Sequence, residues 1–431
     1  MAMFKPIDNI SLIIFRMIFG FLVTFECINF IVSGFVFEHL ISPAYLFPHI
    51  GFEWLSIIQG DVWYVYFAVM GFFAFNIMIG NWYRLSTVLF TILWAGFYFS
   101  QKTMYNNHYY LLMIVSFLLI FLPANAYYSV DAKRNPTIFS LTMPAWVKWL
   151  MIVQISIVYF YATLAKFYPD WLDGTFTKIL YSRVSGRPFL QEIFSQPWFY
   201  ISIAYLGILY DALIVPFLLF KQTRTIALVA SLIFHLSNSL ALPIGIFPYF
   251  ALSFSLFFYP PETLKQFVFK NKPIVNKTSA HKNYQLSTLN QQLIILFLLL
   301  QFALPLRHYF IKGDVFWTEE GHRLSWRMML REKTGNIAIK VVNYSKNTLE
   351  NYDLDKNLSK NQLKQIATKP DFIWQYCQEI KQQYEPDSVA IFVDCKCSIN
   401  QKTPQTLINP SVDMAKARWN YFAHNDWIVL Y

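Results

Sequence analysis

Long runs of apolar residues alternate with short polar segments over the first 305 positions of the chain. A helix that crosses the hydrocarbon core of a bilayer needs about 20 mainly apolar residues. Several of the runs are shorter, so their helices must extend into aromatic and polar flanks or lie at an angle. The pattern predicts about nine transmembrane helices, at Ile10–Val32, Trp63–Ile79, Leu85–Phe99, Tyr109–Pro123, Trp146–Ala165, Phe199–Phe220, Thr225–Leu242, Gly245–Tyr259 and Gln292–Pro305.

The pattern changes after the last of these runs, where the chain becomes more polar. Apolar and polar residues alternate at Ile337–Val342 and Ser388–Val393, which is typical of half-buried strands. The stretch Ser359–Gln383 has helical spacing. We therefore predict a polytopic α-helical membrane protein with two domains, a transmembrane helical domain at 1–305 and a small soluble α+β domain at 306–431.

Composition supports a membrane protein, since 56% of the residues are hydrophobic and only 14% are charged, against about 25% charged residues in a soluble domain. The formal net charge is +10, but the Lys and Arg residues form no single basic stripe, so we expect no nucleic-acid partner. Basic residues such as Lys133, Arg134, Lys221 and Arg224 lie in segments that are cytoplasmic when the N-terminus is inside. With about nine spans, the C-terminal domain is then predicted to be extracytoplasmic.

The chain contains four cysteines, three of them in the C-terminal domain. Cys395 and Cys397 do not make a zinc site, because no second cysteine pair or paired histidines complete a set of four ligands. Cys27 lies in the first predicted helix. In an extracytoplasmic domain thiols tend to oxidise. We therefore expect a disulfide between Cys377 and either Cys395 or Cys397.

Polar residues that could carry chemistry gather at three places near the outer ends of the predicted helices. The first is the run Lys102–Leu111, in which Asn107 and His108 lie at the mouth of the fourth helix. Its tyrosines and amides are compatible with simple anchoring at the membrane interface. Ionisable groups in a membrane segment are nevertheless functional candidates, so both interpretations stay open.

The second place is the end of the fifth helix, where Lys166 follows Ala165 and precedes Asp170 and Trp171. Such a lysine commonly extends its ammonium to the interface and marks the helix end. The alternative is a catalytic base, because an apolar setting disfavours the ammonium and a neutral amine can take a proton from a phenolic substrate. On the residues alone, the anchoring role is favoured.

The third place is the outer half of the seventh helix, which contains His235 and Asn238. Polar groups at this depth find partners inside the helix bundle or line a cavity, and hydrogen bonding between helices is the simpler interpretation. The predicted topology places His108, Lys166 and His235 in the same half of the membrane, on the side of the soluble domain. An apolar substrate could then enter from the lipid and a polar one from outside.

Several motifs match, in order along the chain, those of a known enzyme family. They are Lys102-Thr103 with Asn106-Asn107-His108, Ala124-Asn125 with Tyr128-Ser129-Val130-Asp131, Asp170-Trp171 with Gly174, Ile244-Gly245-Ile246-Phe247, Leu324-Ser325-Trp326-Arg327-Met328-Met329, and Ile399-Asn400 with Asn409-Pro410 and Val412-Asp413. By these motifs the chain resembles gamma-glutamyl carboxylases. It is identified by this resemblance as a bacterial-type member of the vitamin K-dependent gamma-carboxylase family, with a membrane domain of the HTTM type.

The resemblance implies an enzyme that uses reduced vitamin K, oxygen and carbon dioxide. In this family, oxygenation of the hydroquinone to the epoxide generates a strong base, which removes a γ-proton from a protein glutamate before carbon dioxide is added. By motif, Lys166 is the base that starts the reaction and His108 stabilises an anionic intermediate. The residues expected to bind the cofactor are His235, Asn238, Asn107 and Trp171.

Two features differ from animal members of the family. Those carry a second lysine where this chain has Ala165, and they are much longer at the C-terminus, so recognition of a tethered protein substrate is expected to be altered or absent. In a bacterial inner membrane we expect menaquinol, a prenylated naphthoquinol, as the quinol, membrane lipid around the helices, and a glutamate-containing peptide or protein as second substrate. Two alternatives stay open: quinol epoxidation without carboxylation, and a non-enzymatic module that binds lipid or protein.

Overall fold

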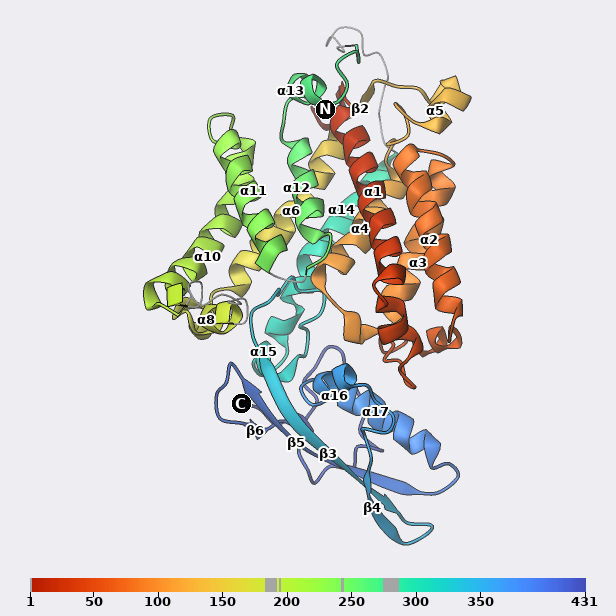
Figure 1. Cartoon of the computed structure of the whole chain (residues 1–431), viewed down its shortest axis with the longest axis vertical. Coiled ribbons are helices and arrows are strands. Elements are labelled where there is room, and N and C mark those ends of the chain that lie inside the picture. The colour runs from red at the N-terminus through yellow and green to blue at the C-terminus, as the bar shows by residue number, and fades with distance from the viewer. Residues whose placement is uncertain (1, 183–191, 194, 242–243, 274–286) are drawn as a thin grey trace.

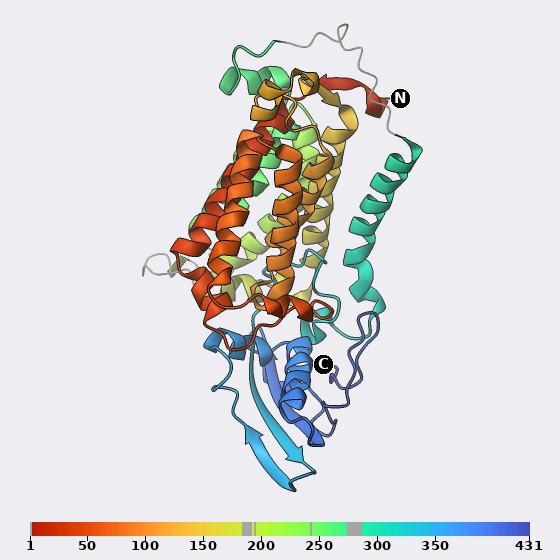
Figure 2. The ribbon, with the colours of Figure 1, turned by 90° about the vertical axis from the view of Figure 1, so that its right-hand side faces the viewer.

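The computed structural model describes the whole chain except residues 1, 183–191, 194, 242–243 and 274–286. The long axis of the molecule runs from a bundle of helices to a small domain built around a sheet (Figure 1). The N-terminus lies at the end of the bundle that is remote from this domain. The C-terminal domain therefore covers one end of the bundle, as the view in Figure 2 also shows.

Within the described residues, each of the nine predicted segments contains a helix, although the end of the seventh segment, Leu242, lies outside them. These helices are α1 (Ile10–Val32), α2 (Val62–Ile79), α3 (Tyr83–Ser100), α4 (Asn107–Phe121), α6 (Ala145–Ala165), α10 (Pro197–Leu219), α11 (Arg224–Ala241), α12 (Phe247–Ser253) with the turn η6 (Phe254–Phe257), and α14 (Thr288–Ala303). The connecting elements are η1 (Ala2–Phe4), β1 (Pro6–Asp8), η2 (Phe37–Ile41), η3 (Glu53–Ile57), η4 (Lys102–Met104), α5 (Val130–Arg134), η5 (Pro136–Ile138), β2 (Thr142–Pro144), α7 (Pro169–Leu172), α8 (Thr175–Ser182), α13 (Pro261–Phe267), η7 (Leu304–Phe310) and α15 (Val315–Thr318).

Length and apolar content divide these helices into two groups. In the part of the chain that the structure describes, five segments are long and apolar enough to cross a membrane. They are Ile10–Val32, Val62–Ile79, Ala145–Ala165, Pro197–Leu219 and Thr288–Phe310. The remaining helices fall short in length or in apolar content. The protein is thus an integral membrane protein with five candidate spans, and nine crossings stay a prediction.

Aromatic side chains fill the centre of the bundle around α1. The ring centre of Phe15 lies 6.3 Å from that of Phe250 on α12, and both side chains are buried. On another side α1 approaches α2 closely, since a Cβ added to Gly20 would lie 2.4 Å from the backbone nitrogen of Met78. Contacts with α2 and α12 thus hold α1 in place. They also fix α12, whose first residue, Phe247, borders the site described below.

The C-terminal domain contains a four-stranded antiparallel sheet of order β4-β3-β5-β6. Its strands are β3 (Lys333–Asn343), β4 (Thr348–Tyr352), β5 (Val389–Ile399) and β6 (Gln405–Thr406). Both predicted strands are confirmed, as parts of β3 and β5. The predicted helical stretch consists of two helices, α16 (Lys360–Ile366) and α17 (Pro370–Gln383). The break precedes Pro370, because a proline disfavours the helical conformation of the residue before it.

The predicted disulfide is wrong, since Cys377, Cys395 and Cys397 are all buried free thiols. The Sγ atom of Cys395 donates a hydrogen bond to the carbonyl oxygen of Ala367 at 3.4 Å. The Sγ atom of Cys397 lies 3.7 Å from the carbonyl oxygen of Ser398. All three side chains belong to the apolar core that α17 and β5 share. They therefore act as small apolar residues, a common role of buried free cysteines.

Candidate active site

Lys166 follows the last residue of α6 and forms an ion pair inside the bundle. Its ammonium contacts the carboxylate of Asp211 on α10 and lies 5.3 Å from the ring centre of Trp171. The side chains of Lys166 and Asp211 are only 12% and 6% exposed. A lysine that merely marks a helix end extends its ammonium to the interface. The buried ion pair therefore favours a role inside the bundle.

The segment that follows Lys166 is held from two sides. On the bundle side, Nε1 of Trp171 donates a hydrogen bond to the carbonyl oxygen of Ala204 on α10 at 2.9 Å. On the other side, the C-terminal domain contacts Asp170, whose carboxylate accepts hydrogen bonds from Asn400 at 2.8 Å and from Lys402 at 2.7 Å. The position of Lys166 thus depends on α10 and on the C-terminal domain together.

An apolar cavity of about 630 Å³ is lined by residues of α6, α10 and α11. Most of its lining side chains are aliphatic or aromatic, and Asp211 is among the few polar ones. Leu206 and Ile233 line the cavity and are also 58% and 66% exposed. The cavity therefore opens sideways, toward the lipid. Five of the six predicted site residues line it: His108, Lys166, Trp171, His235 and Asn238.

His108 stands in the first turn of α4, where the cavity approaches the C-terminal domain. The side chain of Asn106 caps this helix by accepting a backbone N–H bond at 2.7 Å. The His108 ring stacks on Phe247, with 4.8 Å between the ring centres. Asn107 does not line this cavity. Its Nδ2 donates to the carbonyl oxygen of Arg327 at 3.1 Å, and the residue lines the adjoining pocket described below. The structure places Asn107 at the junction between the two domains instead.

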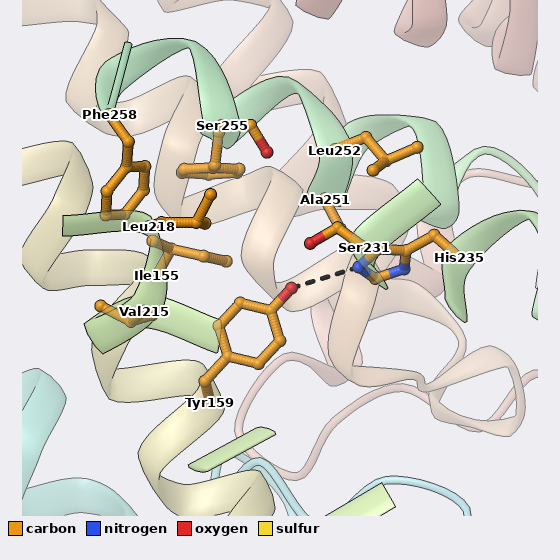
Figure 3. Close-up of a pocket in the computed structure, with 11 residues that line it drawn as sticks. Ile155, Tyr159, Val215, Leu218, Ser231, His235, Ala251, Leu252, Ser255 and Phe258 are labelled. Atoms are coloured by element: carbon orange, nitrogen blue, oxygen red, sulfur yellow. Dashed lines mark hydrogen bonds between the residues drawn. The ribbon is translucent and has the colours of Figure 1, made fainter. Parts of the chain in front are cut away.

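A tyrosine from α6 anchors the ring of His235. The hydroxyl of Tyr159 and Nε2 of His235 are 3.2 Å apart, and both residues line a small pocket of about 10 Å³ (Figure 3). Either atom can donate in this hydrogen bond, so the contact orients the ring without fixing its tautomer. Asn238 lies further along α11 and lines the large cavity. His235, Ser237 and Asn238 of α11 thus line the cavity that contains Lys166.

A second pocket of about 370 Å³, here named the basic pocket, lies between the start of α4 and the C-terminal domain. His108, Met328 and Met329 line both this pocket and the apolar cavity, so the two spaces adjoin. One acidic residue, Glu319, is found among the described residues of its lining. The excess of positive charge favours an anionic occupant. The cationic residues of the lining are Arg323, Arg327, Arg331, Lys333, Lys364 and Lys369.

Burial and neighbouring charges set the protonation of the basic pocket. Burial opposes ionisation of Glu319, but Arg331 and Lys333 outweigh it and hold the pKa of this carboxyl well below its usual range. Glu319 therefore stays anionic and balances part of the positive charge. Burial also lowers the pKa of Lys369 to about 8. The pocket keeps a net positive charge at neutral pH, and this charge decreases at higher pH.

Two carboxylates inside apolar helices are not among the residues predicted from the sequence. One is Asp211, the partner of Lys166. The other is Glu26 on α1, which is buried near Tyr109 and whose Oε2 has no hydrogen-bond partner among the described residues. The signal for both is present in the sequence, because an ionisable residue within a membrane segment is a functional candidate by default.

Other residues of the matched motifs have structural roles. Lys102 is buried and pairs with Asp371 of the C-terminal domain at 2.7 Å, and Arg323 pairs with the same carboxylate at 2.8 Å. This cluster joins the two domains. Asp131 accepts hydrogen bonds from two backbone N–H groups at the start of α3, at 2.8 and 2.9 Å. The motifs therefore include residues that hold the site together as well as residues that line it.

The fold and the site define a class of protein. It is an integral membrane helix bundle whose lipid-facing cavity contains a lysine–aspartate pair and adjoins a basic pocket beneath an α+β domain. The family model of the HTTM domain matches residues 4–262, and that of the vitamin K-dependent gamma-carboxylase lumenal domain matches residues 286–431. No solved structure matches the chain. The chain belongs to the vitamin K-dependent gamma-carboxylase family.

Proposed function

We propose that the protein is a carboxylase that couples oxygenation of a reduced vitamin K, here menaquinol, to carboxylation of glutamate in a peptide or protein. One observation carries this proposal: the Lys166–Asp211 ion pair lies in an apolar cavity that adjoins a basic pocket at His108. The arrangement offers a proton-transfer group to a lipid-soluble substrate and positive charge to an acidic one, in neighbouring spaces.

The cavity suits a prenylated naphthoquinol in size and chemistry. Sites for small molecules typically measure about 300–1,000 Å³ and combine an apolar lining with a few polar groups, and this cavity measures about 630 Å³. Lys166, His235 and Asn238 are polar groups that can orient the quinol ring. The prenyl tail can extend into the lipid past the exposed side chains of Leu206 and Ile233.

Lys166 is the proposed base that starts the reaction. An ammonium cannot accept a proton, but within the pair a proton can move from Nζ of Lys166 to the carboxylate of Asp211. Apolar surroundings favour this transfer, because two neutral groups cost less to desolvate than two charges. The resulting amine can take the phenolic proton of the quinol. Lys166 is then an ammonium again, and Asp211 keeps the first proton.

His108 is the proposed stabilising group on the side of the basic pocket. Its stacking on Phe247 fixes the ring at the edge shared by the two spaces, and a ring N–H can donate to an anionic oxygen there. A bound quinol supplies, through its oxygenation, a base stronger than any side chain, which removal of a γ-proton from glutamate requires. His108 is thus placed to act where this chemistry takes place.

The basic pocket is the proposed site of the glutamyl side chain. An arginine can bind a carboxylate through two parallel hydrogen bonds, and Arg327 and Arg331 line this pocket. Met328 and Met329 line both the pocket and the cavity, so the γ-carbon of a bound glutamate would lie beside the quinol. An enzyme that acted on the quinol alone would need no anion site. The basic pocket therefore favours carboxylation over quinol epoxidation alone.

We further propose that all nine helices cross a bacterial inner membrane, with the N-terminus in the cytoplasm and the C-terminal domain outside. The alternating direction of successive helices in Figures 1 and 2 supports this, as does the position of the N-terminus at the end remote from the C-terminal domain. The matching family model also describes a lumenal domain. Both substrates would then reach the site from the outer half of the bilayer or from outside the cell.

The decisive experiment combines the purified protein with reduced menaquinone, oxygen and labelled bicarbonate, with and without a glutamyl peptide. We expect epoxide, and fixed carbon only when peptide is present. Epoxide without fixed carbon under all conditions would assign the protein as a quinol epoxidase. Neither product, from folded protein that binds the quinol, would support a non-enzymatic module. Lys166→Arg is the matched control for turnover that does not depend on the site.

A further inference from the structure

A polar joint links the C-terminal domain to the segment that carries Lys166, outside both pockets. Its centre is the side-chain amide of Asn400. Oδ1 of Asn400 accepts a hydrogen bond from the backbone N–H of Glu332 at 2.9 Å, and Nδ2 donates to Oδ2 of Asp170 at 2.8 Å. One amide therefore satisfies a donor in the C-terminal domain and an acceptor in the membrane domain.

The position of Asn400 requires an amide. Its side chain is buried, and its backbone has a φ of 50°, in the left-handed region where asparagine and aspartate are the most readily accepted side chains. Asn400 directly follows β5, and its backbone N–H extends the β3–β5 ladder by donating to the carbonyl oxygen of Glu332 at 2.9 Å. An aspartate would fit this backbone, but its second oxygen would face the carboxylate of Asp170.

The joint is close to the reactive groups on both sides. Asp170 is followed directly by Trp171, whose ring lies 5.3 Å from the ammonium of Lys166. Glu332 lies between Arg331 and Lys333, which line the basic pocket. Trp171 and Leu330 also belong to one buried apolar cluster, which includes Ala165, the residue before Lys166. A displacement at the joint would therefore change the position of Lys166 relative to the basic pocket.

We propose that Asn400 is a positioning residue that fixes Lys166 in the cavity, acting through Asp170 and Trp171. This inference rests on the proposed function of Lys166. It makes the C-terminal domain part of the machinery that activates the quinol, in addition to any role in peptide binding. Asn400 lines neither pocket, so its effect on the reaction must pass through the Lys166 segment.

The test exchanges the two polar partners in the full-length protein. Asn400→Asp places two carboxylates face to face, and we expect kcat for epoxide formation to fall at least about tenfold, since a misplacement of about 1 Å can cost a hundredfold. Asp170→Asn keeps an acceptor for the amide and loses only the charge of the pair with Lys402, whose side chain is 47% exposed, so it should cost less than about threefold. The double variant Asp170→Asn/Asn400→Asp restores a donor opposite an acceptor and should regain most of the rate. The loss should appear in kcat more than in quinol affinity, because most of the side chains that line the cavity lie outside the Lys166 segment.

Gln375→Leu is the matched control for general loosening of the domain interface. Gln375 of the C-terminal domain is buried and donates to the carbonyl oxygen of Pro48 in the membrane domain at 3.1 Å, away from the Lys166 segment. This variant should lose stability to a similar degree as Asn400→Asp but keep kcat per folded molecule. Equal losses of kcat in both variants, or near-normal kcat in Asn400→Asp, would overturn the proposal.

A second measurement does not depend on turnover. The rate at which a small apolar acylating reagent modifies Lys166, followed by mass spectrometry, should change several-fold in Asn400→Asp and return toward the wild-type rate in the double variant. It should not change in Gln375→Leu. If the wild-type protein forms no epoxide, the proposed function fails, whereas the acylation rates still decide whether Asn400 positions Lys166. An unchanged rate in Asn400→Asp would refute the positioning role.

Discussion

Replacing Lys166 separates its proposed chemical role from its structural one. In Lys166→Ala, the carboxylate of Asp211 stays buried without its partner, which for buried ion pairs costs about 3–5 kcal/mol. The pair is 12% and 6% exposed, and the carboxylate can also take up a proton, so we expect the lower limit, about 3 kcal/mol. Lys166→Arg keeps a cation beside Asp211, so it should lower the free energy of unfolding by only about 1 kcal/mol, as a typical substitution does.

The rate of epoxide formation gives the complementary result. An arginine stays protonated and cannot act as a base, so Lys166→Arg should bind quinol normally and lose epoxide formation by at least about a hundredfold, or about 2.7 kcal/mol in the activation barrier. Thermal unfolding in detergent measures the stability, and chromatography of the quinone products measures the rate. Adding Asp211→Asn to Lys166→Ala should recover much of the lost stability but none of the rate. Near-normal epoxidation by Lys166→Arg would refute the role of Lys166 as the base.

Three further predictions concern the domain interface, the basic pocket and the topology. Asp371→Asn leaves the buried Lys102 and the partly buried Arg323 without their carboxylate and should destabilise the protein by about 3 kcal/mol in thermal unfolding, whereas Asp355→Asn on the surface should have no effect. Because Lys369 has a pKa lowered to about 8, its charge is lost as the pH rises through this value. The KM for a glutamyl peptide should then rise while quinol affinity stays constant. A KM that does not change with pH would contradict a role of the Lys369 charge in peptide binding. In intact cells without the native cysteines, an impermeant thiol reagent should label a cysteine at Lys356 but not one at Lys133, and the reverse pattern would invert the topology.

The helices could be predicted from the sequence because a membrane imposes a simple requirement. Inside a bilayer, each backbone polar group must be satisfied within the segment or its bundle, so apolar runs become helices, and Ile10–Val32 has the predicted bounds. The alternation in Ser388–Val393 likewise predicted β5. By contrast, the helical stretch expected at Ser359–Gln383 is interrupted before Pro370, because a proline disfavours the helical conformation of the residue before it.

Partners that are distant in the sequence could not be predicted. Lys102 belongs to a motif that suggested chemistry, yet it pairs with Asp371, 269 positions away. The expected disulfide failed because a cysteine pattern does not tell whether a thiol is a core residue or half of a cystine. Asp211 was recognisable as an isolated carboxylate, but only the packing of α6 against α10 identifies Lys166 as its partner.

The sideways opening of the cavity determines which concentration of quinol would set the rate of the proposed reaction. A quinol that arrives past Leu206 and Ile233 is dissolved in the bilayer, so the rate would follow its mole fraction among lipids and not its amount per volume of water. Empty detergent micelles should therefore slow the reaction at constant total quinol, by surface dilution. The epoxide would return to the same two-dimensional pool. An enzyme that regenerates the quinol could then share that pool with this protein without any contact between the two.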